Sequence, residues 1–536
     1  MTSPIRRTAL ARLLLATALA ASVGGFAGPA AAAEDTPIVV ARNMDVNSLD
    51  PARGFCDTCQ IYLTAVYDTL LTLGDDNKTL VPKLATSWEA NDDQTAFTFH
   101  IAPNATFADG SPVTSEDVAW TLQRLKNIKG DPSFLMDSLA SIETPDDKTV
   151  VIHTSEPNSE FLGILAASYT GIINKKLAEA NGATAGEDAA TADQADTWFF
   201  ANSAGGGAYE LDSYRTGDEL RLKANPNYWD KKPAISEVII KQVEDAVTQA
   251  QMLQTGDADI AMQIDPDTAA TISDPEIVVD TVPSFNFLYI AVSPGAKGNS
   301  VPLTKPVREA IADAIDYEGM IDFTVGGKGK LQPVAIPNGF PGTDDLPMPK
   351  QDLDKAKSLL AEAGLSDGFT IEAHYPAVNA YGVDISLMMQ KVQQDLSRVN
   401  ISLNLTPTTF AVWREEVGGD GIPMTAVYYA PDYFGSAQYV QYFSMIPGQP
   451  WAKRAGVGKV EDLGNGEKEA ELLKKAMASS GDAMVGAYHD IALQMIDDKV
   501  IIPLVSPDLV LASRKGIEGV RYSACCNLAL GQLSRD

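Results

Sequence analysis

The sequence predicts strands and amphipathic helices that follow one another in two or three packed lobes. Residues 95–101 alternate apolar and polar side chains, which is the pattern of a half-buried strand. Residues 109–112 read Asp-Gly-Ser-Pro, which is turn chemistry, and Thr114 with Asp117 three residues later forms the capping box that begins a helix. The chain has 536 residues, which is more than one hydrophobic core supports.

The N-terminus has the three parts of a secretory signal peptide. Arginines at positions 6, 7 and 12 precede an almost uninterrupted apolar run from residue 13 to residue 26, and Ala31-Ala32-Ala33 resembles a cleavage site. We therefore expect residues 1–33 to be removed, with cleavage near Ala33, and the mature protein to be periplasmic. The apolar run is too short for a comfortable membrane span. A lipid anchor is not expected, because the first cysteine, Cys56, lies well beyond the cleavage site.

Charge and motif content exclude several classes of function. The chain carries 71 acidic and 41 basic residues, an excess that opposes binding to nucleic acid or to an anionic membrane surface. It contains no G-x-S-x-G, H-E-x-x-H, P-loop or G-x-G-x-x-G motif, and its four histidines are scattered. We therefore expect neither an enzyme nor a bound cofactor or metal.

The four cysteines are expected to form disulfides, because an even number in an exported chain usually does so. Cys56 and Cys59 can form one bridge, while Cys525 and Cys526 leave a vicinal or a cross-terminal bridge open. A four-thiolate zinc site is disfavoured, since adjacent cysteines chelate a tetrahedral metal poorly. A redox Cys-x-x-Cys is also disfavoured, because it would begin a helix after a strand and Cys56 is expected in a loop.

Several segments of the chain match the patterns of one protein family. Residues 80–127 resemble the signature of the family 5 solute-binding proteins of ABC importers, the peptide- and nickel-binding group. The family's N-P-n-Y-W segment stands here as Asn225–Trp229, its G-x-x-D-I segment as Gly256–Ile260, and one of its helices as Asp354–Gly364. The resemblance covers residues 37–520.

The resemblance implies an α/β architecture of the two-lobed periplasmic binding protein type, in its large, cluster-C form, with an extra subdomain in the first lobe. The implied divisions are lobe I at 34–72, 200–285 and 506–536, its inserted subdomain at 73–199, and lobe II at 286–505. It also implies that a solute is held between the lobes of a monomer, which then docks on permease subunits served by ATPase subunits. The polar stretch at 181–196 is expected to be a surface excursion.

Asp432 is the main ligand-binding residue that the resemblance implies. Peptide-binding members pair the peptide α-ammonium with an aspartate in a W-x-x-D segment, and the matching positions here run from Tyr429 to Asp432. A buried carboxylate is costly unless a cation joins it, which makes it selective for amines. The alternative is a structural one, in which Asp432 caps a helix.

Further site residues come from the same alignment. Asn379 stands where dipeptide binders carry an arginine that grips the peptide carboxylate, and residues 372–386 contain no Lys or Arg. A free dipeptide is therefore disfavoured. Aromatic residues expected to line the cleft, with core packing as the alternative, are Trp413, Tyr429, Tyr433, Phe434 and Tyr381. Residues of the first lobe expected near the cleft are Asn43, Asp45, Asp57 and Gln60.

The sequence therefore predicts the periplasmic substrate-binding component of an ABC importer, with a peptide or another amine-bearing solute as its ligand. A receptor of the same family for nickel, a metallophore or an oligosaccharide is the first alternative. A secreted hydrolase or chaperone-like protein is a distant one, and the lack of a nucleophile–base pair argues against hydrolysis.

Overall fold

The computed structural model describes residues 36–419, 421–460, 463 and 466–536. The predicted signal peptide at residues 1–33 lies outside these ranges. No helix within them is both long and apolar enough to cross a membrane.

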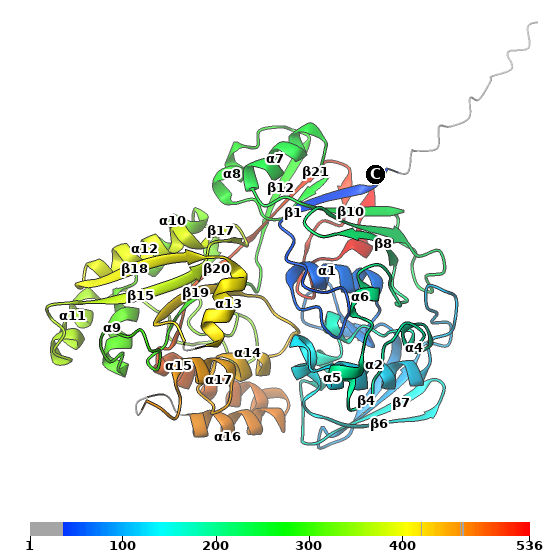
Figure 1. Cartoon of the computed structure of the whole chain (residues 1–536), viewed down its shortest axis with the longest axis horizontal. Helices are drawn as coiled ribbons and strands as arrows, with labels where there is room; N and C mark the ends of the chain where they lie inside the picture. Colours follow the sequence, from blue (N-terminus) through cyan, green and yellow to red (C-terminus); the bar gives the residue numbers. More distant parts are fainter. Residues whose placement is uncertain (1–35, 420, 461–462, 464–465) are drawn as a thin grey trace, which may run out of the picture. The chain divides into compact units, whose positions relative to one another are not determined.

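One lobe is built on a seven-stranded sheet of order β12-β21-β11-β1-β10-β9-β8 (Figure 1). Strand β1 (Ile38–Arg42) runs parallel to both β10 (Glu237–Gln242) and β11 (Ile260–Ala261). Strand β21 (Leu509–Arg514) brings the C-terminal part of the chain into the same sheet. We call this part the first lobe. Its other strands are β8 (Tyr209–Arg215), β9 (Glu219–Ala224) and β12 (Ile277–Val282), and the helices next to them are α1 (Asp57–Val66), α7 (Ala246–Thr255) and α8 (Pro266–Thr271).

A second lobe is built on a six-stranded sheet of order β14-β20-β13-β19-β15-β18. Strands β13 (Phe287–Val292) and β19 (Met424–Tyr429) pair in antiparallel fashion, and Phe287 lies opposite Tyr429. The end of β19 therefore delivers the chain to the segment that contains Asp432. The other strands are β14 (Gly329–Lys330), β15 (Phe369–Pro376), β18 (Ile401–Thr408) and β20 (Ile501–Pro507). The helices of this part are α9 (Lys305–Ala314), α10 (Tyr317–Val325), α11 (Leu353–Glu362), α12 (Ile385–Ser397) and α13 (Phe410–Gly418).

Four further helices extend the second lobe around an aromatic core. They are α14 (Ala437–Phe443), α15 (Pro450–Ala455), α16 (Gly466–Met477) and α17 (Gly481–Asp498). Trp451 is fully buried, and its ring lies 5.8 Å from that of Tyr289, with Phe443 5.2 Å from the same tyrosine. This packing fixes α14 against strand β13.

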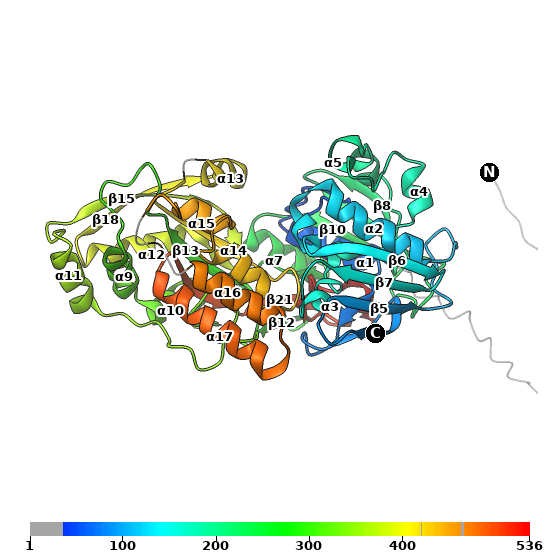
Figure 2. The same ribbon diagram turned by 90° about the horizontal axis from the view of Figure 1, so that it is seen from below.

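A separate antiparallel sheet has the order β4-β5-β7-β6, and helix α2 (Ser115–Ile128) packs against it (Figure 2). The predicted capping box is confirmed, because the Thr114 hydroxyl accepts the Asp117 N–H and the Asp117 carboxyl accepts the Thr114 N–H. The predicted strand at 95–101 is β5, with Phe97 and Phe99 fully buried. The strands are β4 (Ala85–Ala90), β5 (Ala96–Ile101), β6 (Leu139–Asp146) and β7 (Thr149–Thr154).

Short elements connect these parts. The short helices are α3 (Phe161–Ile164), α4 (Lys175–Glu179), α5 (Ala189–Ala192), α6 (Asp196–Phe199) and 3-10 turns at Asp131–Met136, Ser168–Thr170 and Leu530–Gln532. Two-stranded pairs are β2 (Leu71–Leu73) with β3 (Leu80–Pro82), β16 (Asn379–Ala380) with β17 (Val383–Asp384), β22 (Ile517–Glu518) with β25 (Ser534–Arg535), and β23 (Tyr522–Ser523) with β24 (Asn527–Leu528). The division of the chain at 72/73, 199/200, 285/286 and 505/506 stays a prediction, as does the inserted subdomain at 73–199.

Candidate functional site

The loop after β1 leads into helix α1 through a disulfide. The predicted bridge between Cys56 and Cys59 is confirmed, and it encloses Asp57 and Thr58. One sequence argument was wrong, because Cys56 is the N-cap of α1 and the Cys-x-x-Cys therefore does begin a helix. The bridge fixes the position of Asp57 at the first turn of that helix.

The second predicted bridge is absent from the structure. Cys525 and Cys526 are free thiols whose sulfur atoms lie 2.7 Å apart, and the cross-terminal alternative is ruled out because Cys56 is bonded to Cys59. Adjacent Cα atoms lie about 3.8 Å apart across a trans peptide, which is shorter than the spacing that disulfides prefer. Cys526 is buried, and burial raises the pKa of its thiol.

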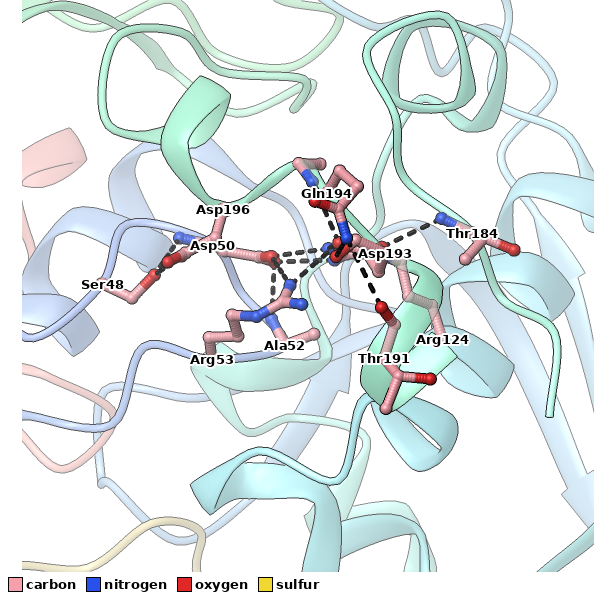
Figure 3. Close-up of polar contacts among 11 residues, drawn as sticks. Ser48, Asp50, Ala52, Arg53, Arg124, Thr184, Thr191, Asp193, Gln194 and Asp196 are labelled. Carbon is pink, nitrogen blue, oxygen red and sulfur yellow. Dashed lines mark hydrogen bonds and ion pairs between the residues drawn. The ribbon is translucent and has the colours of Figure 1, made fainter. Parts of the chain in front are cut away.

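A buried ion-pair network holds the loop that carries Asp57 (Figure 3). The Arg124 guanidinium of α2 donates to Asp50 (Nη1 to Oδ1, 2.7 Å) and to Asp193 (Nε to Oδ2, 2.8 Å). Arg53 joins both carboxylates, at 2.7 Å and 3.0 Å. Asp193 is buried, so the expectation of a surface excursion at 181–196 was wrong at this residue. Its long-range partner, Arg124, explains the burial.

Asp45 and Asp57 lie side by side but have different environments. The Asp45 carboxylate accepts the backbone N–H groups of Asp57 (3.0 Å) and Thr58 (2.9 Å). Its negative charge therefore interacts favourably with the positive N-terminal end of α1. Asp57 is half-buried, and no basic side chain among the described residues forms an ion pair with its carboxyl. The Tyr381 hydroxyl of the second lobe is nonetheless close enough to lower its pKa.

Asp432 faces this loop from the second lobe. Its side chain is buried, and its carboxyl accepts from the Tyr429 hydroxyl at 3.2 Å. Its backbone N–H donates to Gln438. The helix that follows begins at Ala437 with Ser436 as N-cap, so Asp432 does not cap it.

Burial raises the pKa of both Asp57 and Asp432 to about 7. The charge of Asp45 raises the pKa of Asp57 further, and Arg42 opposes this increase. The charge of Asp57 in turn raises the pKa of Asp432. The two carboxyl groups therefore lie within electrostatic range of each other, although they belong to different lobes.

Tyrosines and an amide complete the surroundings of these carboxyls. Burial raises the pKa of Tyr169, Tyr381 and Tyr428, and each of these hydroxyls also senses the charge of Asp57. The Gln60 amide of α1 donates to the carbonyl of residue 431 at 3.3 Å, which joins the two lobes directly. The structure thus brings together Asp57, Gln60, Tyr381, Tyr429 and Asp432 from the predicted set.

The other predicted site residues have local roles in the structure, and their ligand roles stay predictions. The Trp413 indole donates to Thr425 at 2.8 Å, and the Phe434 ring packs in a tilted arrangement against Phe340, with the ring centroids 4.5 Å apart. The Asn379 amide oxygen accepts the Gly382 N–H. The Asn43 side chain accepts from Gln242 at 2.7 Å, and the Tyr433 hydroxyl donates to Glu160 at 3.1 Å.

Glu160 is a contact between lobes that the sequence reasoning missed. It is buried, and its carboxylate accepts the backbone N–H groups of Ser436 (2.8 Å) and Ala437 (3.0 Å) at the start of α14. Helix α14 has no acidic residue in its own first turn to interact with its positive N-terminal end. This lack was the one feature of the sequence that indicated an acid from elsewhere in the chain. Glu160 therefore links the segment after β7 to the second lobe.

A cavity of about 380 Å³ lies on another side of Tyr433, between the 3-10 turn at Asp131–Met136 and helix α16. Its lining is mostly apolar and includes Phe134, Leu135, Leu473 and Met477. We place the candidate site at Asp57 and Asp432 instead, because charged and polar groups of both lobes converge there. Within the described ranges, no cluster of three His, Cys, Asp or Glu side chains could hold a metal ion.

Comparisons with known proteins agree on one family. Residues 79–448 match the model for bacterial extracellular solute-binding proteins, family 5 Middle. The probable D,D-dipeptide-binding periplasmic protein DdpA of Escherichia coli (strain K12) is 28% identical over 525 residues, which cover 96% of each chain. The glutathione-binding protein GsiB of Salmonella typhi is 28% identical over 415 residues, which cover 76% of each chain.

Solved structures share the fold. The dipeptide-binding protein from Pseudoalteromonas sp. SM9913 in complex with Met-Leu has a TM-score of 0.80 at 19% identity, covering 94% of this chain and 100% of that one. AgaA of A. tumefaciens R10 in complex with agropinic acid has a TM-score of 0.77 at 23% identity, covering 94% and 99%. The α/β fold is therefore the two-lobed fold of these proteins, as the sequence predicted.

Proposed function

We propose that this chain, which belongs to the bacterial extracellular solute-binding proteins of family 5, captures an amine-bearing solute between its lobes at Asp432. The family supplies the general role, that of the substrate-binding component of an ABC importer. The amine is the part that we infer from the geometry. A peptide is the ligand class named for the relatives, and it is the first candidate here.

The observation that carries the proposal is the environment of Asp432. The carboxyl is buried, and its one side-chain hydrogen bond comes from a neutral hydroxyl, that of Tyr429. A buried carboxylate without a cationic partner is unfavourable, which is why the pKa of Asp432 is raised to about 7. A ligand ammonium would supply the missing charge and so favour the closed arrangement that contains it.

The same family membership supports the remaining steps of transport. The mature protein is proposed to be a periplasmic monomer, exported by a signal peptide that is cleaved near Ala33 and free of a lipid anchor. It would deliver its solute to permease subunits, and ATPase subunits would supply the energy. No catalytic step is assigned to this chain.

A free dipeptide fits the second lobe less well than other amines. Asn379 stands where the resemblance places a carboxylate-gripping arginine, and its side chain is engaged in the turn to Gly382. An amine whose carboxylate lies far from the ammonium, such as a longer peptide, avoids this conflict.

Native mass spectrometry of the protein purified from its own periplasm tests the proposal. The expected result is a bound mass that is released on denaturation and carries a primary or secondary amine. The matched control is Asp432→Asn, which keeps the shape of the side chain and should purify without that mass. A co-purifying solute that has no amine would contradict the proposal.

A further inference from the structure

Arg42, the last residue of strand β1, is a buried arginine without an ionic partner. The residue is 2% exposed, and within the described chain its side chain makes one hydrogen bond, from Nε to the Asn43 carbonyl at 3.3 Å. No carboxylate oxygen of the described residues lies within 4.0 Å of its nitrogen atoms. An arginine is almost never buried unless it is paired, because its charge loses the stabilisation that water provides. Arg42 therefore lacks an anion that the described residues do not supply.

The end of this guanidinium is open to a neighbouring molecule. The terminal nitrogen atoms of Arg42, Nη1 and Nη2, have no hydrogen-bond partner among the described residues. They are nevertheless not among the fully enclosed polar atoms without a partner, so they retain contact with space that solvent can reach. A bound molecule in that space can therefore accept hydrogen bonds from them.

Arg42 lies at the edge of the first-lobe sheet where sheets of this kind bind their ligands. Strands β1, β10 and β11 are parallel, so their carboxyl ends meet at one edge, where Arg42 pairs with Gln242, the last residue of β10. Open α/β sheets bind ligands outside the carboxyl ends of their strands. Helix α1 begins at the same edge, because Asp45 in the loop after β1 accepts the N–H groups of Asp57 and Thr58.

The second lobe approaches this edge at two points. The hairpin of β16 and β17 turns at Tyr381 and Gly382, whose φ values are 55° and 83°. A positive φ strains a tyrosine, and this strained turn brings the backbone of the second lobe against the first. A Cβ added to Gly382 would stand 3.4 Å from the Ile264 carbonyl, shortly after β11. At the second point, Gln60 of α1 donates to the carbonyl of residue 431 at 3.3 Å.

The loop that follows Arg42 is bonded next to both of these points. The Asn43 N–H donates to the side-chain oxygen of Gln263 at 2.5 Å, and Gln263 precedes the residue that Gly382 approaches. Asp45 holds the first turn of α1, which carries Gln60. The contacts on both sides therefore place the end of β1, with Arg42, where the two lobes meet.

The acids of the same loop do not replace the missing anion. The Asp45 carboxylate is engaged by the N–H groups of α1 and by the Thr58 hydroxyl at 2.6 Å. The charge of Arg42 lowers the pKa of Asp57, but no carboxylate oxygen of Asp57 lies within 4.0 Å of the guanidinium. An ion pair with a bound molecule is therefore still open to Arg42.

We infer that Arg42 holds a carboxylate of the solute. The inference rests on the proposed function, because the ammonium of the same solute is placed at Asp432. It narrows the solute class to peptides and other amino-acid derivatives with a free carboxylate. A guanidinium matches a carboxylate in charge and can donate two parallel hydrogen bonds to it. The first lobe then binds the anionic group and the second lobe the cationic group, so only the closed form holds both.

Calorimetric titration with peptides that differ in their end group tests the inference. The probes are di-, tri- and tetra-alanine, each as the free acid and as the C-terminal amide, which lacks the carboxylate. For the pair that binds most tightly, the wild-type protein is expected to prefer the acid at least about 30-fold. Arg42→Gln should bring that ratio close to one by weakening the binding of the acid. Arg215→Gln, the matched control, loses the same charge from an exposed side chain and should keep the wild-type ratio.

A measurement without ligand separates a ligand-binding arginine from a structural one. Arg42→Met replaces the guanidinium by an apolar side chain. The variant should unfold at the same urea concentration as the wild type or at a higher one, because an unpaired charge is then no longer buried. A large fall in the unfolding midpoint would show that Arg42 stabilises the fold by offsetting the charges of Asp45 and Asp57, and would overturn the inference.

The same titrations separate the failure of this inference from that of the proposed function. An acid-to-amide ratio near one in the wild type, or an unchanged ratio in Arg42→Gln, would overturn the role of Arg42 alone. Equal affinity of the wild type and Asp432→Asn for both members of a pair would overturn the proposed function, since both members carry the ammonium. Failure of every free acid to bind at millimolar concentration would overturn the assignment of the solute to peptide-like carboxylates.

Discussion

Two groups of aspartates in this protein have opposite environments. Asp50 and Asp193 are held by Arg124 and Arg53 in a complete network (Figure 3), whereas Asp57 and Asp432 have no basic side chain bonded to them. Burial alone would raise the pKa of Asp193, but its hydrogen bonds and attraction to Arg124 outweigh burial and lower it. The pKa values of Asp57 and Asp432 rise to about 7. The first group thus has its cationic partners within the chain, whereas the second has none bonded to it, and this contrast is the basis of the proposal that a solute supplies a cation.

The largest expected effect comes from breaking the complete network. Arg124→Ala would leave Asp50 and Asp193 buried without their main partner, which typically costs about 3–5 kcal/mol of unfolding free energy. Urea denaturation measures this loss. Arg215→Ala is the matched control, because the Arg215 side chain is 62% exposed in its ion pairs and its removal should cost less than about 0.5 kcal/mol. Equal effects of the two variants would contradict the structural role of the network.

The next largest effect is expected on ligand affinity, from a substitution of Asp432, which has no basic partner. Asp432→Asn removes a charge without changing shape, and loss of one member of a buried charged pair typically costs about 2–5 kcal/mol, or roughly 30- to 5000-fold in ligand affinity. Calorimetric titration with the co-purified solute measures the change.

Asp432→Asn is expected to weaken ligand binding but not to lower the unfolding free energy of the ligand-free protein. The unfolding free energy of ligand-free Asp432→Asn should stay the same or rise, because no unpaired carboxylate is then buried. A fall in ligand-free stability comparable to that of Arg124→Ala would assign Asp432 to the structural group instead.

The comparison also shows what could be predicted from the sequence. Local patterns identified the capping box at Thr114 and the strand at 95–101, because such signals depend on neighbouring residues. Asp432 was found through a family resemblance, and its unpaired state required the structure. Asp193 was misplaced on the surface, because its partner Arg124 is 69 residues away in the chain.

Contacts between lobes were the hardest to predict. Glu160 accepts a hydrogen bond from Ser436, which is 276 residues away in the chain. Asp57 of the first lobe likewise affects the pKa of Tyr381 in the second lobe. No periodicity or spacing in the sequence relates these positions, since each depends on how two separately folded sheets face each other. The strained turn at Tyr381 was likewise hidden, because a Tyr-Gly pair is not a usual signal for this hairpin.

A smaller effect is expected at Glu160, a buried acid that accepts the backbone N–H groups at the start of α14 and the Tyr433 hydroxyl. Glu160→Ala would leave the N–H groups of Ser436 and Ala437 without an acceptor. We expect this to destabilise the closed arrangement of the lobes by about 1.5–3 kcal/mol. Small-angle scattering should then show a larger radius of gyration without ligand, and ligand affinity should fall at least about tenfold. Ser159→Ala, which loses the hydroxyl contacts to the Ala476 carbonyl and the Met484 sulfur, is the milder control. An unchanged radius and affinity in Glu160→Ala would show that this contact does not hold the lobes together.

The last expected effect is the dependence of the unfolding free energy on pH. The two groups of aspartates should change this free energy over different ranges of pH. Asp57 and Asp432 have a pKa of about 7 in the folded protein against 3.8 in the reference state. Between about pH 4 and pH 7 the folded protein therefore holds more protons than the unfolded chain, so its ligand-free stability falls as the pH rises. Asp193, whose pKa is lowered, has the opposite effect, and its contribution to stability is lost as the pH falls below about 4.

Ligand binding should reverse the trend in the upper window. A cationic solute requires the ionised carboxyls, so its affinity should rise by about tenfold per pH unit for each carboxyl that loses a proton on binding, and level off above pH 7. Titrations between pH 5 and pH 7.5 measure the slope, after correction for any ionisation of the solute itself. A slope near one indicates Asp432 alone, and a slope near two indicates Asp432 together with Asp57. An affinity that is flat across this range would show that neither carboxyl receives a cation, and the distinction between the two groups would then have no bearing on binding.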